Sequence, residues 1–290
     1  MEGPARLKSK ISNIEGLLEI IGAMRSLAAI RVQEGQNALA GVRGYAETVG
    51  EAIAQAVGIF GAPVAGWRTD LPGPRNTVVF CSEHGLVGAF NERLVEYAMD
   101  HGDARAQLCV AGARGALYAE EHRLAVAWTV PMATHAAGAL ETARRVAAEL
   151  YRRIGEGACA NVDVVFAKYG SGGQWVIEKE TVFPPDLTRF ADRTVGPLPL
   201  HNLEPEILME KLVAEFVLSQ LVRAALESFA SENGARLRVM ESAHENVEDK
   251  LADLRRQESR LRQEMTTTEM LDVVTGSEAI RGYPGRTARE

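Results

Sequence analysis

The sequence has few cysteines and few aromatic residues. Its three cysteines, Cys81, Cys109 and Cys159, are an odd number without the spacing of metal ligands, which argues against a disulfide framework or a zinc site. We therefore expect the protein to reside in a reducing compartment. Aromatic residues make up 6% of the chain, which weakly disfavours a β-sandwich and favours helices.

Long apolar runs and excess positive charge are also lacking. No apolar stretch approaches the roughly 18 residues of a membrane-spanning helix, and the first residues lack the apolar core of a secretory signal, so we expect any membrane association to be indirect. The formal net charge of -7 gives no electrostatic footprint for a nucleic-acid binder. The 290 residues, 46% of them hydrophobic, match a soluble globular protein of about two domains.

Two long segments have the apolar spacing of α-helices. Residues 4 to 58 carry an apolar side chain every three or four positions, but several glycines lie among them, each costing about 1 kcal/mol relative to alanine. This helix should persist only if another packs closely against it. The second segment, from 204 to about 280, has heptad spacing near its end. That predicted seam consists of Val247, Leu251, Leu254, Glu258, Leu261, Met265, Thr268 and Asp272.

Helices of these lengths are too long to fit within a compact globular fold. At about 1.5 Å per residue they would be roughly 80 and 110 Å long, whereas a compact chain of this size has a radius of gyration of about 19 Å. The economical solution is an antiparallel pair formed by the two chain ends.

Between these helices the pattern is that of a small α/β domain. A Pro- and Gly-rich run from 58 to 75 indicates a linker. Residues 75 to about 200 then alternate short β-branched runs with helical patterns, which predicts a largely parallel sheet. The predicted helices are 91–99 and 136–154. The predicted strands are 77–81, 107–111, 162–168 and 175–183, of which the last two form a hairpin around Gly170–Gly173.

Catalytic and cofactor motifs are incomplete. Gly170–Gly173 lacks a following helix and the ending of a P-loop, and neither Gly85–Gly88 nor Gly112–Gly115 completes a dinucleotide fingerprint. The six histidines are scattered, Cys81 with His84 supplies only two metal ligands, and no nucleophile elbow is visible. We therefore predict no catalytic residues, no cofactor and no metal.

Three segments resemble the gamma subunit of F-type ATP synthases, in the right order and over essentially the whole chain. The N-terminal segments are 7–14 (LKSKISNI) and 22–31 (GAMRSLAAIR). The central segment is 81–91 (CSEHGLVGAFN). The C-terminal segments are 230–233 (ASEN), 262–269 (RQEMTTTE) and 274–276 (VTG).

The resemblance implies a non-catalytic rotary shaft that couples ion flow to ATP synthesis or hydrolysis. Its fold would be a long antiparallel coiled coil, residues 1–58 and 204–280, with a central Rossmann-like α/β domain, 75–200, and a tail, 281–290. The implied partners are the alpha and beta subunits of the surrounding ring, an epsilon subunit and a proteolipid c-ring. The implied location is peripheral, at the cytoplasmic face of the bacterial inner membrane. The transported ion, proton or sodium, is selected elsewhere.

The resemblance also implies contacts with the ring. Met24 and Arg25 match a segment that faces an acidic lever of the beta subunit, and Arg31 matches a basic position in the same helix. The C-terminal contact positions are Arg262, Gln263, Thr267 and Glu269. We expect Gln263 and Thr267 on one strip of the helix, Arg262 on a neighbouring strip, and Glu269 about 120° from Arg262.

The chain departs from the family pattern near these positions. Gly22 stands where the family commonly has lysine, and Val32, Gln33 and Glu34 replace a basic cluster after Arg31. Electrostatic coupling to the lever is therefore expected to be weaker or rearranged.

Other interpretations of the same residues remain open. By pattern alone Met24 is a core methionine, and Arg262 and Glu269 are ordinary solvated helix charges. The whole chain could be an α/β enzyme with dimerising helical arms, or a passive coiled-coil scaffold. Co-purification with an alpha/beta hexamer that hydrolyses ATP would distinguish a shaft from both.

Overall fold

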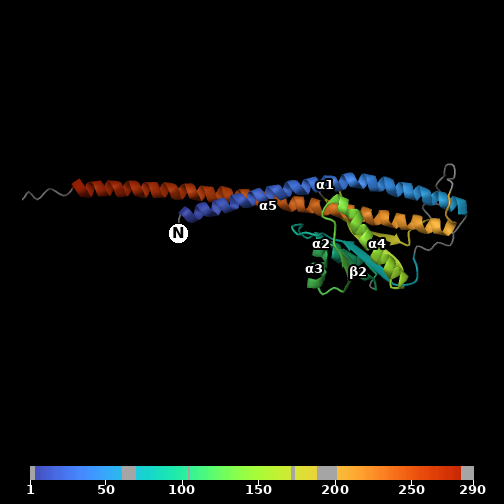
Figure 1. Ribbon diagram of the computed structural model, residues 1–290. Helices are drawn as coiled ribbons and strands as arrows, with labels where there is room; N and C mark the ends of the chain where they lie inside the picture. The colour runs from blue at the N-terminus through green and yellow to red at the C-terminus, as the bar shows by residue number, and fades with distance from the viewer. Residues whose placement is uncertain (1–3, 61–69, 104, 171–173, 188–200, 282–290) are drawn as a thin grey trace, which may run out of the picture. The chain divides into compact units, whose positions relative to one another are not determined.

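The computed structural model describes residues 4–60, 70–103, 105–170, 174–187 and 201–281, and Figure 1 shows their helices and strands. The chain divides into two compact units. The terminal unit combines Met1–Met24 with Met240–Glu290, and the central unit is Arg25–Val239. Helices α1 (Pro4–Phe60) and α5 (Pro205–Arg281) each contribute to both units.

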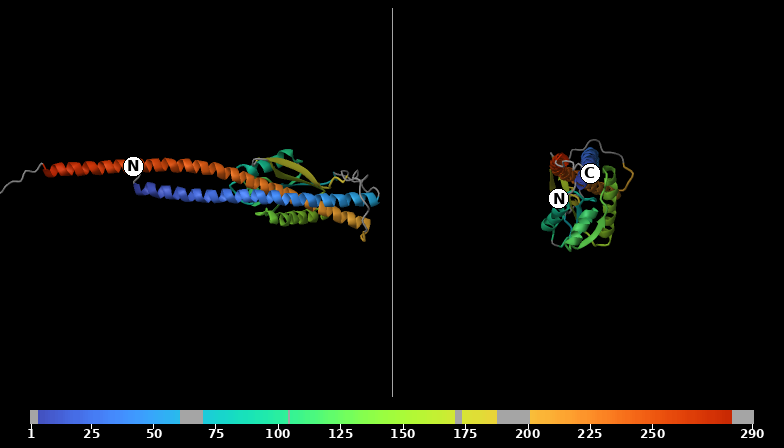
Figure 2. Two further views of the ribbon diagram at one scale, coloured as in Figure 1. Left: turned by 90° about the horizontal axis from the view of Figure 1, so that it is seen from above. Right: turned by 90° about the vertical axis from the view of Figure 1, so that its left-hand side faces the viewer.

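The terminal unit is an antiparallel helical pair. Its apolar contact consists of buried Leu7 and Ile11 from α1 against Leu251 and Leu254 from α5, with Ile14, Leu18 and Leu261 packed beside them. An ion pair crosses it from Arg255 Nη2 to Glu15 Oε1 at 2.7 Å. In Figure 2 the first part of α1 lies beside α5, and the last part of α5 continues past the start of α1.

The predicted heptad seam is only partly occupied. Leu251 and Leu254 are buried and Leu261 is half-buried, but Met265, Thr268 and Asp272 are exposed. Within the described residues, the first turns of α1 reach α5 only as far as the hollow that Ala5 and Leu7 share with Met265 and Glu269. The predicted seam is therefore only partly formed: Met265 still borders a hollow with Ala5 and Leu7 of α1, whereas the polar positions Thr268 and Asp272 are exposed.

The central unit contains a five-stranded sheet in the order β3-β2-β1-β4-β5. All neighbouring strands are parallel except β4 and β5, which are antiparallel and pair from Tyr169 with Trp175 onward. The strands are β1 (Arg75–Phe80), β2 (Gln107–Ala111), β3 (Val126–Val130), β4 (Asn161–Tyr169) and β5 (Trp175–Phe183). The predicted mainly parallel sheet and its hairpin are confirmed, whereas edge strand β3 was not predicted.

Helices cover both faces of this sheet. They are α2 (Phe90–His101), α3 (Ala113–Glu121) and α4 (Ala139–Gly155), with a short 3-10 helix (Ala136–Gly138) before α4. The predicted helix 136–154 therefore starts as a 3-10 turn.

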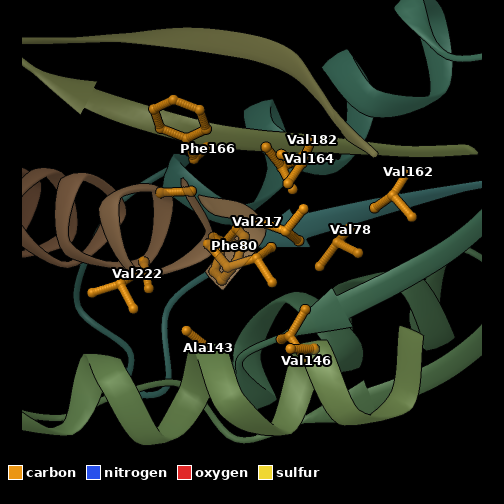
Figure 3. Packing of buried hydrophobic residues seen from close by; sticks show 14 of the residues in the cluster. Val78, Phe80, Ala143, Val146, Val162, Val164, Phe166, Val182, Val217 and Val222 are labelled. Atoms are coloured by element: carbon orange, nitrogen blue, oxygen red, sulfur yellow. The ribbon is translucent and has the colours of Figure 1, made fainter. Parts of the chain in front are cut away.

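Strand alternation separates two apolar clusters. On one face Phe80 and Phe166 pack with Val146 of α4 and Val217 of α5, as Figure 3 shows. On the other face Val79 and Val165 pack with α2, through Phe90, Leu94 and Val95. The sheet thus lies between α4 and the long helices on one face and α2 on the other.

The three thiols are expected to be unreactive in the folded protein. Cys81, Cys109 and Cys159 are buried, and burial raises the pKa of each, that of Cys109 to about 12. Because the thiolate is the nucleophile, Ellman's reagent at pH 8 should label them only as the protein unfolds. A Ser259→Cys variant, whose new thiol lies at an exposed position of α5, is the matched control and should react at once. Fast labelling of a native cysteine in the unmodified chain would contradict the expected burial.

Candidate partner-contact surfaces

The four C-terminal candidate residues lie on an exposed stretch of α5 in the terminal unit. Arg262 is 78% exposed and forms an ion pair with Glu258, 3.4 Å between Nη2 and Oε1. Gln263, Thr267 and Glu269 are exposed as well, and the Thr267 hydroxyl donates to the Gln263 carbonyl at 2.8 Å. The hydroxyl proton is therefore used within the helix, and its oxygen remains able to accept a hydrogen bond from a partner.

Arg262 and Glu269 border one hollow of about 380 Å³ beside the first turns of α1, where Leu7 and Lys8 also line it. The expectation that they lie about 120° apart is therefore wrong. Seven residues turn a helix by about 700°, which is only about 20° short of two full turns. Gln263 and Thr267 do not line this hollow. The structure thus places a cation and an anion on one face, with the two uncharged residues beside it.

The N-terminal candidates form a separate group on α1. Met24, at the boundary of the terminal unit, is half-buried. Counted from the Arg255–Glu15 ion pair, Met24 and Arg262 lie in opposite directions, about 24 Å apart along the helical pair. In the central unit Arg25 and Arg31 are half-buried, and the charge of Arg31 acts on Glu232 of α5. Arg31 therefore has an electrostatic partner within its own chain.

Helix α5 occupies the place where doubly wound sheets usually bind ligands. In such sheets the ligand crevice lies at the carboxyl ends of the strands, where the strand order reverses, which is here between β1 and β4. The Ser228 hydroxyl donates to the carbonyl of Phe80 at 2.5 Å, and the Ser231 hydroxyl donates to the carbonyl of Ala167 at 2.9 Å. These two strand ends are thus bound to a helix of the same chain.

The loop after β1 and the glycine after β2 are held next to this edge by backbone contacts. Glu83 accepts hydrogen bonds from the backbone N–H groups of Ala113 at 3.2 Å and Met132 at 2.8 Å, which ties the loop after β1 to the ends of β2 and β3. Gly112 has a φ of +111°, and a Cβ there would lie 2.6 Å from the Cys81 carbonyl oxygen. At Gly112 the backbone therefore packs too closely for a side chain.

Sequence reasoning missed a buried polar cluster on α5. Arg236 is 6% exposed and pairs with Glu232 at 2.7 Å. Nη2 of the same guanidinium donates to the carbonyl of His84 at 3.1 Å and to that of Gly85 at 3.2 Å. Its Nη1 donates to Asn233 Oδ1 at 2.9 Å. The spacing of four residues between opposite charges was visible, but it is equally typical of exposed helices.

Neither a metal centre nor a membrane span is found in the described part of the chain. Among those residues no cluster of three or more His, Cys, Asp or Glu side chains could bind a metal ion. None of the described helices combines the length and the apolar character needed to cross a bilayer. The fold defines the class of protein: an α/β protein in which two long helices accompany a small five-stranded sheet and its covering helices.

Comparison with known proteins identifies the family. The chain matches the family model described as ATP synthase over residues 4–280. The ATP synthase gamma chain of Anaeromyxobacter sp. (strain Fw109-5) is 31% identical over 296 residues, covering 95% of this chain and 98% of that protein. That of Rhodospirillum rubrum is 26% identical, covering 94% and 98%. The chain therefore belongs to the ATP synthase gamma-chain family.

Solved structures share the fold. A chain of the Euglena gracilis mitochondrial ATP synthase rotor has a TM-score of 0.62 at 12% identity, covering 91% of this chain and 98% of that chain. A chain of the Tetrahymena thermophila mitochondrial ATP synthase central stalk and c-ring has a TM-score of 0.56 at 19% identity, covering 77% and 99%. With the family membership, this likeness assigns the chain the role of rotary shaft in an ATP synthase.

Proposed function

We propose that this shaft couples the flow of protons or sodium ions through a membrane sector to ATP synthesis or hydrolysis at a ring of alpha and beta subunits. The proposed further partners are an epsilon subunit and a proteolipid c-ring, and the proposed location is the cytoplasmic face of a bacterial inner membrane. The chain itself is proposed to carry no catalytic residue. Its contribution would be mechanical.

One observation carries this proposal: the last part of α5 is long, exposed and partly apolar. Beyond Leu261 the described residues of α1 reach this part of α5 only at the hollow bordered by Arg262 and Glu269, yet large apolar side chains continue along the helix. These exposed side chains are Met265, Met270, Leu271, Val273 and Val274. Apolar residues in such a run mark an interaction surface, which a surrounding ring would cover.

The polar residues of the same stretch suit a rotating contact. Arg262, Gln263, Thr267 and Glu269 offer donors and acceptors that are not buried within their own chain. Exposed ion pairs are worth only about 0–1 kcal/mol, so contacts of this kind can form at one angle and be released at the next. Met24, Arg25 and Arg31 are proposed to contact the ring from α1.

Replacing Arg262 and Glu269 together by alanine is expected to leave the thermal melt of the isolated chain almost unchanged, because both side chains are exposed. In the assembled complex the same variant should lower ATP synthesis per complex, measured in reconstituted vesicles, or weaken retention of the shaft. The matched control replaces the exposed pair Arg256 and Asp253, which lies earlier on α5, and should leave coupling normal.

Two results would contradict the contact assignment. A sharp fall in the melting temperature with normal coupling per assembled complex would make Arg262 and Glu269 structural. Equal losses of coupling in the control variant would remove the specificity of the stretch 262–269. The enzyme and scaffold alternatives are tested separately, since only a shaft should co-purify with an alpha/beta hexamer that hydrolyses ATP.

A further inference from the structure

Glu232 is a carboxyl group buried in the interior of the central unit. Its side chain is 5% exposed, and Oε1 accepts a hydrogen bond from Arg236. Its other oxygen, Oε2, has no hydrogen-bond partner among the described residues. An ionised carboxylate with one buried oxygen unpaired is costly, whereas a protonated carboxyl loses much less on leaving water. The geometry therefore favours the neutral form of this group.

Charged and titratable groups face Glu232 from each element around it. Arg236 lies on α5 itself and Arg31 comes from α1, while Glu83 lies in the loop after β1. Cys81, at the end of β1, also interacts with Glu232. Burial is the main cause that raises the pKa of Glu232, to about 7 overall; the charge of Glu83 adds to the rise, and the attraction of Arg236 and Arg31 opposes it.

Arg236 remains held whether or not Glu232 is charged. Its guanidinium donates to the carbonyl oxygens of His84 and Gly85 and to the side-chain oxygen of Asn233, all of which are uncharged acceptors. These bonds connect α5 to the loop 82–88, which runs between β1 and α2. We call this connection the loop clamp. Because the acceptors of the loop clamp are uncharged, protonation of Glu232 leaves these hydrogen bonds intact.

We propose that Glu232 is a proton-binding group that makes the loop clamp sensitive to pH, with the closed clamp favoured when Glu232 carries a proton. The proposal goes beyond the shaft role and does not require it. Opening of the loop 82–88 would expose the carboxyl to water, where it ionises freely. The closed and open states therefore differ in proton affinity, and pH shifts the balance between them.

The direction follows from proton linkage. In the closed state the pKa of Glu232 is about 7, above the ordinary value of 4.5 that applies when the carboxyl is exposed. Between pH 4.5 and about 7 the closed state therefore binds more protons than the open state. Clamp stability is then greatest at low pH and decreases as pH rises from about 4.5 to about 7. Above about pH 7 both states are ionised, and no further change is expected.

Hydrogen exchange of the full-length chain tests this, followed by mass spectrometry from pH 5 to 8.5 and corrected for intrinsic exchange rates. In the unmodified chain the opening constant of segment 82–88 should rise by up to about tenfold per pH unit up to about pH 7 and then level off. The Glu232→Gln variant has nearly the same shape but cannot ionise, so its opening constant should not change with pH. Segment 175–183 of the hairpin serves as the internal reference.

Glu227→Gln is the matched control, because Glu227 is also buried on α5 but pairs with Arg43 and the backbone N–H of Tyr169. It should keep the pH dependence of segment 82–88.

Two results would overturn the proposal: an opening constant of segment 82–88 that does not depend on pH in the unmodified chain, or an unchanged pH dependence in Glu232→Gln. If that variant does not fold, the infrared titration of the unmodified chain decides: a protonated carboxyl band that disappears with a midpoint near pH 7 supports it, and absence of this band at pH 6 overturns it.

Discussion

Replacing Gly115 by valine is expected to lower the free energy of unfolding by about 3 kcal/mol, the upper range for overpacking a buried site. A Cβ at this position of α3 would lie 2.3 Å from both Cβ and Sγ of Cys81, and 3.1 Å from Cγ1 of Val110. Cys81 is buried at the end of β1 and cannot move away without displacing the strand. Chemical denaturation followed by circular dichroism would measure the loss.

Gly44→Val is the matched control for this change. Gly44 lies on an exposed position of α1, and a Cβ there meets nothing within 4 Å. Because valine has a somewhat better helix propensity than glycine, the free energy of unfolding should change by no more than about 0.5 kcal/mol. Equal losses in the two variants would show that the close approach of α3 to Cys81 does not limit the side chain at 115.

Replacing Arg236 by methionine is expected to cost about 3–5 kcal/mol of stability at pH 8, because it leaves a buried charge without its partner. Glu232 would lose its ion pair, and the carbonyls of His84 and Gly85 would lose their donor. The loss should be smaller at pH 6. There Glu232 is mostly protonated in the unmodified chain, so the groups that lose the Arg236 donor are uncharged.

Arg238→Met tests whether burial explains this cost. Arg238 lies two residues further along α5 and is exposed, so its replacement should change the free energy of unfolding by less than about 0.5 kcal/mol. Urea titrations of both variants at the two pH values would make the comparison. A loss for Arg236→Met that is equal at pH 6 and pH 8 would argue against a charge on Glu232 that depends on pH in this range.

The α/β body was largely readable from local sequence patterns. The β-branched runs on either side of Gly170–Gly173 predicted the antiparallel pair β4 and β5, because strand propensity and turn residues act over a few positions. Strand β3 was missed. Its five residues, Val126–Val130, alternate between half-buried and exposed positions at the sheet edge, and such a run gives little apolar contrast.

The candidate contacts were less accessible to sequence reasoning. The family resemblance supplied Arg262 and Glu269, but pattern analysis placed them on different strips, and the structure places both beside one hollow. The contact of Arg31 with the ring stays a prediction, and the structure adds that its charge acts on Glu232 of the same chain. Which group a side chain meets depends on residues distant in sequence, which no local spacing contains.

By itself, the sequence determined two long amphipathic helices, a mainly parallel sheet between them and the family, because periodicity, turn residues and motifs are local properties of the chain. Only the tertiary structure decided where the heptad seam ends, since that depends on where α1 begins at Pro4. It alone distinguished Glu232 and Arg236 from ordinary exposed helix charges. Burial is set by the helices, strands and loops that pack around a residue, and the chain acquires those neighbours only on folding.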